Sequence, residues 1–82
     1  MPDDQVYERN KNLVQRLAAS MTINHFDADD VFQEVFLRCI QKKPTFKDKT
    51  REKLWFIKAT SECARLINAE RVKAEQVKRE GG

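Results

Sequence analysis

Apolar residues recur along this chain at the three-to-four-residue spacing of amphipathic helices, in three separate segments. The segments are residues 4–21, residues 27–43, and a third from residue 50 to beyond residue 71. No stretch alternates with the two-residue period of a strand. We therefore predict an all-α fold, a compact three-helix bundle with a long third helix.

The second segment carries start and stop signals. Asp27 is a good N-cap residue, and Asp30 is placed three residues later to complete a capping box. Phe26 and Val31 occupy the two positions of a hydrophobic staple. Two lysines followed by Pro44 suit the end of a helix.

This second segment has two different faces when its residues are placed at 100° steps. One face is apolar and is expected to join the core; it comprises Val31, Phe32, Val35, Phe36, Cys39 and Ile40. The opposite face gathers hydrogen-bond acceptors around one leucine: Asp30, Gln33, Glu34 and Leu37. Such a patch suits docking against a basic helix of another protein. The alternative is an ordinary solvated face, because these residue types are common on surfaces.

The third segment also has two faces. Its core side is expected to hold Phe56, Thr60, Cys63, Ala64 and Ile67. The other side holds Lys58, Glu62, Arg65 and Ala69, flanked by Trp55, and basic residues before it extend the positive field: Lys47, Lys49, Arg51 and Lys53. Cations beside an exposed aromatic ring suit single-stranded DNA, which they bind through phosphates and stacked bases. Alternatively, Trp55 belongs to the core, and Glu62 forms surface ion pairs with Lys58 and Arg65.

Composition limits the class of protein. The chain has 82 residues, 40% hydrophobic and 35% charged, as expected of one small soluble domain. Residues 1–40 hold four basic and seven acidic residues, whereas residues 41–82 hold twelve basic and six acidic ones. The basic half suggests a polyanionic partner and the acidic half a different one, although solvated helix faces would give the same asymmetry.

Enzymatic and membrane functions are not expected. The sequence has no metal-ligand cluster, no phosphate-binding glycine loop and no nucleophile beside a base, so we expect no catalysis and no cofactor. His25 is interpreted as structural or incidental. Cys39 and Cys63 fall within helical patterns and are interpreted as buried thiols of a reducing compartment. Without an apolar span or a leader, the chain is expected to be cytoplasmic.

Residues 27–37, Asp-Ala-Asp-Asp-Val-Phe-Gln-Glu-Val-Phe-Leu, resemble region 2.2 of bacterial RNA polymerase sigma factors. The likeness is to the sigma-70 family, in its extracytoplasmic-function group. Residues 7–22 are similar to the helix before that region, and "KPTFKDKTREKLWFIKAT" (residues 43–60) is similar to the lysine-rich loop and Trp-containing helix start after it. The resemblance covers the chain to about Arg71.

The resemblance implies two partners. The polar face of the second segment would bind the clamp coiled coil of the largest subunit of core RNA polymerase, through Asp30, Gln33 and Glu34 with Leu37 at the edge. The third segment would melt the promoter −10 element and capture its non-template strand, with bases flipped out of the stack. The implied DNA-binding residues are Lys49, Arg51, Lys53, Trp55, Lys58, Glu62 and Arg65.

Three positions depart from the family pattern. Glu62 stands where the family usually has an asparagine; a carboxylate repels phosphate but can accept a hydrogen bond from the exocyclic amine of cytosine. Leu66 stands where many members have an acidic residue. Ala69 stands where many have an arginine, with Arg71 nearby as a substitute.

The sequence predicts one folded domain and leaves two rival functions open. Residues 1–72 would form the region 2-like domain, and residues 73–82 a polar helical extension or a linker toward a region 4 domain that does not follow in this sequence. The chain would be either trimmed to the first domain or a natural single domain. One rival is a protein-only module of sigma fold that binds polymerase or an anti-sigma factor and has lost promoter reading. The other is a DNA-binding domain unrelated to polymerase, which would leave the polar patch unexplained.

Overall fold

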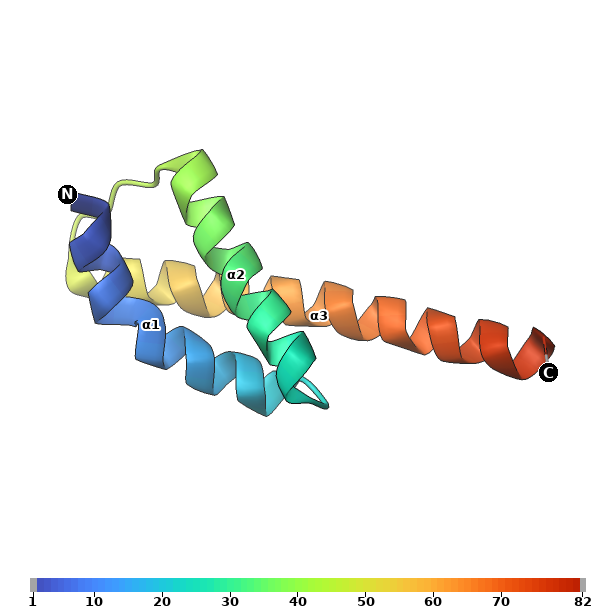
Figure 1. The fold of residues 1–82 in the computed structure, drawn as a ribbon. Helices are drawn as coiled ribbons and strands as arrows, with labels where there is room; N and C mark the ends of the chain where they lie inside the picture. Colours follow the sequence, from blue (N-terminus) through green and yellow to red (C-terminus); the bar gives the residue numbers. More distant parts are fainter. Residues whose placement is uncertain (1, 82) are drawn as a thin grey trace.

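The computed structural model describes the backbone of residues 2–81 and the side chains of residues 5–73. Within this range it has three helices and no strand: α1 (Pro2–Met21), α2 (His25–Lys42) and α3 (Lys49–Gly81). Helices α1 and α2 pack against the first part of α3, and the rest of α3 projects from the bundle as one continuous helix (Figure 1). The predicted all-α bundle with a long third helix is confirmed.

The core is formed by apolar side chains from all three helices, the largest of which is Phe56. The buried residues are Val14, Ala18, Val31, Val35, Phe56, Ala59, Cys63 and Ala64. The predicted core side of α3 is confirmed, including buried Thr60, whose hydroxyl donates a hydrogen bond to the Phe56 carbonyl oxygen at 2.6 Å. Ile40 was wrongly predicted as a core residue. It is 62% exposed because the last turn of α2 leads out of the bundle toward the connector.

The N-cap of α2 lies three residues earlier than the sequence predicts. Asn24 is the N-cap, and its Oδ1 accepts a hydrogen bond from the Asp27 backbone N–H at 2.9 Å. The predicted Asp27 cap is therefore wrong, and with it the capping box and the staple, since Phe26 is 77% exposed. Asparagine caps a helix as well as aspartate does, which leaves the carboxylate of Asp27 available for another partner.

The connector between α2 and α3 has well-defined ends. Lys43 adopts the left-handed conformation (φ 46°, ψ 55°), and its N–H donates to the Cys39 carbonyl oxygen at 2.9 Å. Pro44 follows and prevents the helix from continuing, as predicted. At the start of α3, Asp48 Oδ1 accepts a hydrogen bond from the Arg51 backbone N–H at 2.8 Å.

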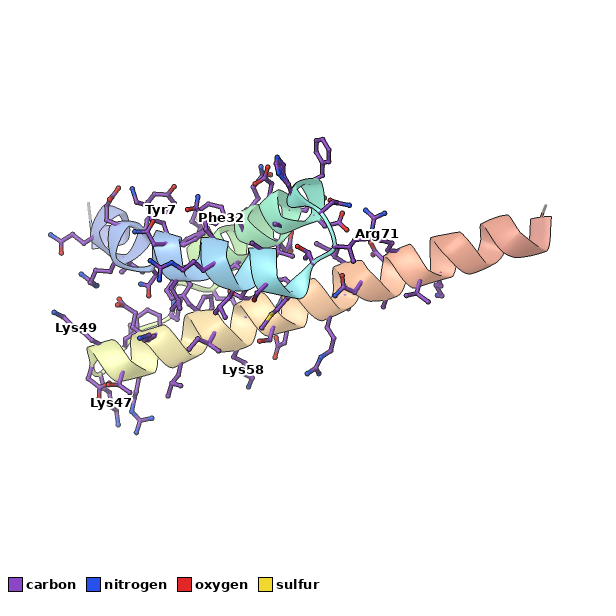
Figure 2. All side chains as sticks on the ribbon, turned by 90° about the horizontal axis from the view of Figure 1, so that it is seen from below. Tyr7, Phe32, Lys47, Lys49, Lys58 and Arg71 are labelled. Carbon is purple, nitrogen blue, oxygen red and sulfur yellow. The ribbon has the colours of Figure 1, made fainter. Side chains whose placement is uncertain are left out.

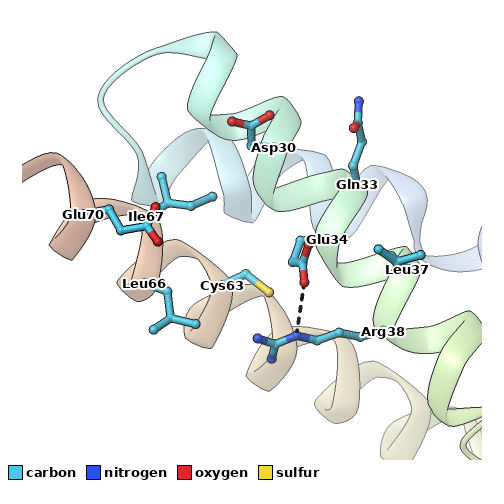
Figure 3. Close-up of a pocket in the computed structure, with 9 residues that line it drawn as sticks. All are labelled: Asp30, Gln33, Glu34, Leu37, Arg38, Cys63, Leu66, Ile67 and Glu70. Atoms are coloured by element: carbon cyan, nitrogen blue, oxygen red, sulfur yellow. Dashed lines mark ion pairs between the residues drawn. The ribbon is translucent and has the colours of Figure 1, made fainter.

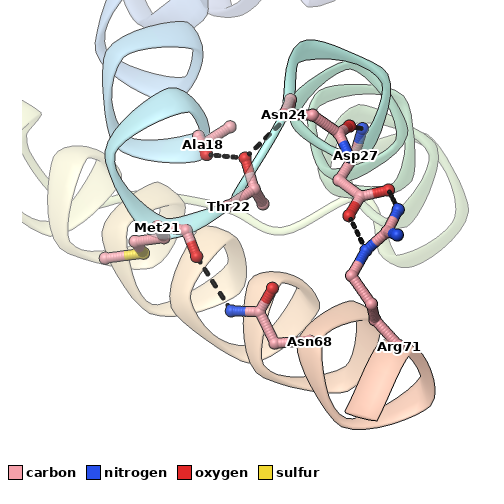
Figure 4. Close-up of polar contacts among 7 residues, drawn as sticks. All are labelled: Ala18, Met21, Thr22, Asn24, Asp27, Asn68 and Arg71. Atoms are coloured by element: carbon pink, nitrogen blue, oxygen red, sulfur yellow. Dashed lines mark hydrogen bonds and ion pairs between the residues drawn. The ribbon is translucent and has the colours of Figure 1, made fainter. Parts of the chain in front are cut away.

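Two bidentate arginine–carboxylate pairs tie the helices together. Arg9 of α1 donates to both carboxylate oxygens of Glu52 in α3, at 3.0 and 2.7 Å. Arg71 of α3 donates to both oxygens of Asp27 in α2, at 2.7 and 2.8 Å (Figure 4). These hydrogen bonds outweigh the effect of burial and lower the pKa of each carboxyl group. Both carboxylates are buried, so each pair fixes the position of α3.

A third polar contact lies near the Arg71 pair. The Asn68 side-chain amide donates to the Met21 carbonyl oxygen at 2.8 Å, which joins α3 to the end of α1 (Figure 4). Beyond this point α3 remains helical to Gly81. The division of the chain into residues 1–72 and 73–82 stays a prediction, and the side chains of residues 74–82 lie outside the described part.

Candidate functional site

The polar patch predicted on α2 is formed by side chains that face solvent together. Val31 and Val35 are fully buried, and their burial turns the opposite face of the helix outward. That face carries Asp30, Gln33, Glu34 and Leu37, all of them exposed. We call these four residues the α2 patch. The structure thus brings together all the residues that the sequence assigned to polymerase binding.

The α2 patch forms one side of an open groove between α2 and α3, with a volume of about 450 Å³. Helix α3 forms the other side (Figure 3). The groove is lined by Asp30, Gln33, Glu34, Leu37, Arg38, Cys63, Leu66, Ile67 and Glu70. Buried Cys63 and half-buried Ile67 give it an apolar floor. Sequence reasoning did not assign Arg38 or Glu70 to a site, and it noted Leu66 only as an unusual residue.

Arg38 connects the α2 patch to the outer side of α3. Its Nε lies 4.0 Å from Glu34 Oε1, and its Nη1 lies 3.4 Å from Glu62 Oε2. Among the described residues, Glu62 therefore pairs with an arginine of another helix. Its predicted ion pairs with Lys58 and Arg65 are not observed there. Glu62 is thus held beside a cation at the position where the resemblance leads one to expect an asparagine.

The predicted DNA-binding cations are all exposed. They are Lys49, Arg51, Lys53, Lys58 and Arg65. Figure 2 shows Lys47 at the end of the connector, Lys49 in the first turn of α3, and Lys58 further along that helix. Exposed lysine and arginine side chains on one helix can neutralise successive phosphates of a nucleic-acid strand.

Trp55 lies between the two environments that the sequence left open, the core and the exposed side of α3. Its side chain is half-buried and packs against the core. The ring makes edge contacts with Phe56, at 4.9 Å between centroids, and with Phe46, at 6.1 Å. These contacts fix the orientation of the ring.

Other chemically distinctive residues have structural surroundings. Burial raises the pKa of the Cys63 thiol, which disfavours the reactive thiolate. The side chains described here include no group of three His, Cys, Asp or Glu that could hold a metal ion. Arg71, considered as a substitute for the arginine missing at Ala69, is engaged with Asp27 instead. None of the described helices is long and apolar enough to cross a membrane.

Comparison with known proteins agrees with this arrangement. A family model described as Sigma-70 region 2 matches residues 6–71, which extend from the first turns of α1 to the arginine that pairs with Asp27. Neither a curated protein nor a solved structure matches the chain. The family match covers most of the sequence, with all of α2, most of α1 and the first part of α3. The chain therefore belongs to the sigma-70 region 2 family, whose domains in general bind core RNA polymerase and act in promoter melting.

Proposed function

We propose that this chain is the region 2 domain of a sigma factor of the extracytoplasmic-function group, and that it acts in the cytoplasm without catalytic activity. Its α2 patch binds the clamp coiled coil of the largest polymerase subunit. The exposed side of α3 holds the non-template strand of the −10 element. An anti-sigma factor is a further partner of the same domain.

The observation that carries the polymerase assignment is the exposure of the whole α2 patch in a chain of this family. Asp30, Gln33 and Glu34 present acceptor oxygens to solvent, and Leu37 adds apolar area at the edge of the patch. A basic helix could satisfy these acceptors with charge-assisted hydrogen bonds while burying the leucine. The net negative charge of residues 1–40 would attract such a helix before contact.

The DNA assignment depends on the cations and on the tryptophan. Lys49, Arg51 and Lys53 lie in the first turns of α3, and Lys58 and Arg65 follow on the same helix. Phosphates would bind to these cations, and an extruded base could lie against the accessible part of Trp55. Glu62 would accept a hydrogen bond from the exocyclic amine of a base, which favours cytosine or adenine over thymine at that position.

A protein-only module is the second candidate, and the Arg38–Glu62 pair favours it. That pair places a carboxylate among the DNA-facing cations and occupies an arginine that could otherwise contact phosphate. In such a protein the α2 patch would still bind polymerase or an anti-sigma factor. Binding of a −10 non-template oligonucleotide by the chain would exclude this candidate.

The test of the main proposal is titration of the chain against the isolated clamp coiled coil. We expect saturable binding that is lost in a Gln33→Ala/Glu34→Ala variant of unchanged helix content. The matched control is Gln15→Ala/Glu8→Ala, which alters the same residue types on α1. Absence of binding by the unaltered chain at tens of micromolar would contradict the proposal.

A further inference from the structure

The α2 patch forms one wall of the groove between α2 and α3, and residues of α3 form the second wall. Leu66 and Glu70 of α3 line it opposite Asp30, Glu34 and Leu37 of α2 (Figure 3). Leu66 is 58% exposed, which places a large apolar side chain at the opening of the groove, across from Leu37.

The charges around the groove select its occupant. Its lining holds three carboxylates, those of Asp30, Glu34 and Glu70, and one cation, Arg38. That cation is shared between Glu34 and Glu62. Asp30 and Glu70 have no ion pair among the described residues. The groove therefore has an excess of acceptors, which repels phosphate and attracts cations, so a nucleic acid is excluded as its occupant.

The apolar part of the lining indicates that the occupant also carries an apolar side chain. Leu37 and Leu66 come from the two walls, and Ile67 and Cys63 lie between them at the floor. A side chain that enters here would bury apolar area on both helices. Carboxylates on both walls would at the same time meet cations on either side of that apolar residue.

We propose that this groove receives one helix of the polymerase clamp, with Leu66 and Glu70 as binding residues that complete the α2 patch. The occupant is a helix that presents an apolar residue flanked by cationic ones, which is the helix-in-groove mode of recognition. The inference rests on the proposed function and extends it, because it makes α3 a two-sided helix: one side faces DNA and the side next to α2 faces polymerase. It also gives Leu66 a role that DNA binding does not supply.

The test compares two leucines of α3 that are equally exposed. Leu66 lines the groove, whereas Leu54, which is 57% exposed, does not. Binding of each fluorescently labelled variant to intact core RNA polymerase is measured by anisotropy without DNA. We expect Leu66→Ala to weaken binding about tenfold and Leu54→Ala less than twofold, because Leu66 is buried in the complex.

Glu70, the charged residue of the α3 wall, is tested with Glu70→Gln. We expect about threefold weaker binding at low salt and a smaller difference at high salt, because the contact is electrostatic. Glu8→Gln on α1 is the control for the change in net charge and should leave binding unchanged. Circular dichroism checks folding, and Leu66→Gln serves as a second variant if Leu66→Ala loses helix content.

The outcomes separate this inference from the proposed function. If the unaltered chain does not bind polymerase, the proposed function itself fails. If the chain binds and Gln33→Ala/Glu34→Ala abolishes binding, but Leu66→Ala and Leu54→Ala behave alike, then only the second wall is refuted. A tenfold effect confined to Leu66 supports a two-walled groove.

Discussion

The outward faces of α2 and α3 differ both in charge and in surroundings. On α2, the four residues of the patch are exposed, and within the described part of the chain only Glu34 among them has an ion pair, at a loose 4.0 Å. On α3, Trp55 is half-buried against two phenylalanines, and Glu62 is held by an arginine from α2. The α2 patch is therefore presented to solvent by its own helix, whereas the outer face of α3 is partly organised by its neighbours.

This difference explains where sequence reasoning succeeds. The direction of a side chain on α2 depends on helical periodicity, which a wheel reproduces. The partner of a polar residue on α3 depends on which helix lies beside it, and periodicity holds no information about that.

The largest effect is expected from reversing a charge on the α2 patch. Glu34→Lys places a cation where we expect the basic clamp helix to bind, and like charges in contact are strongly unfavourable. We expect the affinity for the clamp coiled coil to fall about 100-fold. Glu8→Lys makes the same change in net charge on α1 and should change that affinity less than twofold. Equal losses in the two variants would show that only net charge matters.

Removing two cations from the outer face of α3 is expected to act on DNA alone. Lys58→Ala/Arg65→Ala should lower the affinity for a single-stranded −10 oligonucleotide about tenfold. The slope of log K against log salt should decrease in magnitude by roughly 1.4, because each phosphate contact on a single strand contributes about 0.7. Lys11→Ala/Lys42→Ala is the matched control of equal charge. Binding to the clamp coiled coil should not change. A similar loss of affinity for the coiled coil would show that the two faces act as one binding site.

Neutralising a carboxylate on the inner side of α3 should affect folding instead of binding. Glu52→Gln keeps the shape of the side chain but removes the charge paired with Arg9, and we expect a loss of about 1 kcal/mol in the free energy of unfolding. For a domain of this size that corresponds to a decrease in Tm of about 4–8 °C. Thermal denaturation followed by circular dichroism measures it. An unchanged Tm would mean that the pair contributes nothing.

The pair of Arg9 and Glu52 should also make the free energy of unfolding depend on pH. Because hydrogen bonds from Arg9 lower the pKa of Glu52 in the folded state, the carboxylate stabilises the fold at pH values above its unfolded pKa of about 4.3. This contribution is lost as the pH falls through the lower folded pKa. The difference in stability between the unaltered chain and Glu52→Gln should therefore be full at pH 7 and shrink below about pH 4. A difference that grows in acid would contradict the assignment.

The smallest effect is expected at Glu62. Glu62→Asn breaks an exposed pair with Arg38, so stability should change by less than about 0.5 kcal/mol. Affinity for single-stranded DNA should rise a few-fold, because a repulsive charge is removed and Arg38 becomes available for phosphate. Anisotropy with oligonucleotides that differ in one base of the −10 element measures the preference. If neither affinity nor preference changes, Glu62 belongs to a surface pair and does not read bases.

Most of the fold and one of the two faces could be predicted from the sequence. The patch on α2 and the core side of α3 follow from residues three and four apart on one helix. The contacts that were missed join residues distant in sequence: Arg9 to Glu52 across 43 positions and Arg71 to Asp27 across 44. Asp27 was predicted as a cap because aspartate favours that position, but the structure uses the equally suitable Asn24.

The groove could not be predicted for the same reason. On a helical wheel, Leu66 and Glu70 are isolated surface residues of α3. Whether they line a groove depends on which helix packs beside α3. The unusual leucine was the only signal in the sequence. Only the packing of α2 against α3 shows that it shares a hollow with Leu37.

The most direct test of two separate faces is a ternary binding experiment. A fluorescent −10 non-template oligonucleotide is first bound by the chain, and the clamp coiled coil is then added to saturation. If α2 and α3 present separate sites, the anisotropy should rise further as the ternary complex forms, and the affinity for DNA should not fall. Release of the oligonucleotide by the coiled coil would show that both partners compete for one surface, which would contradict the account.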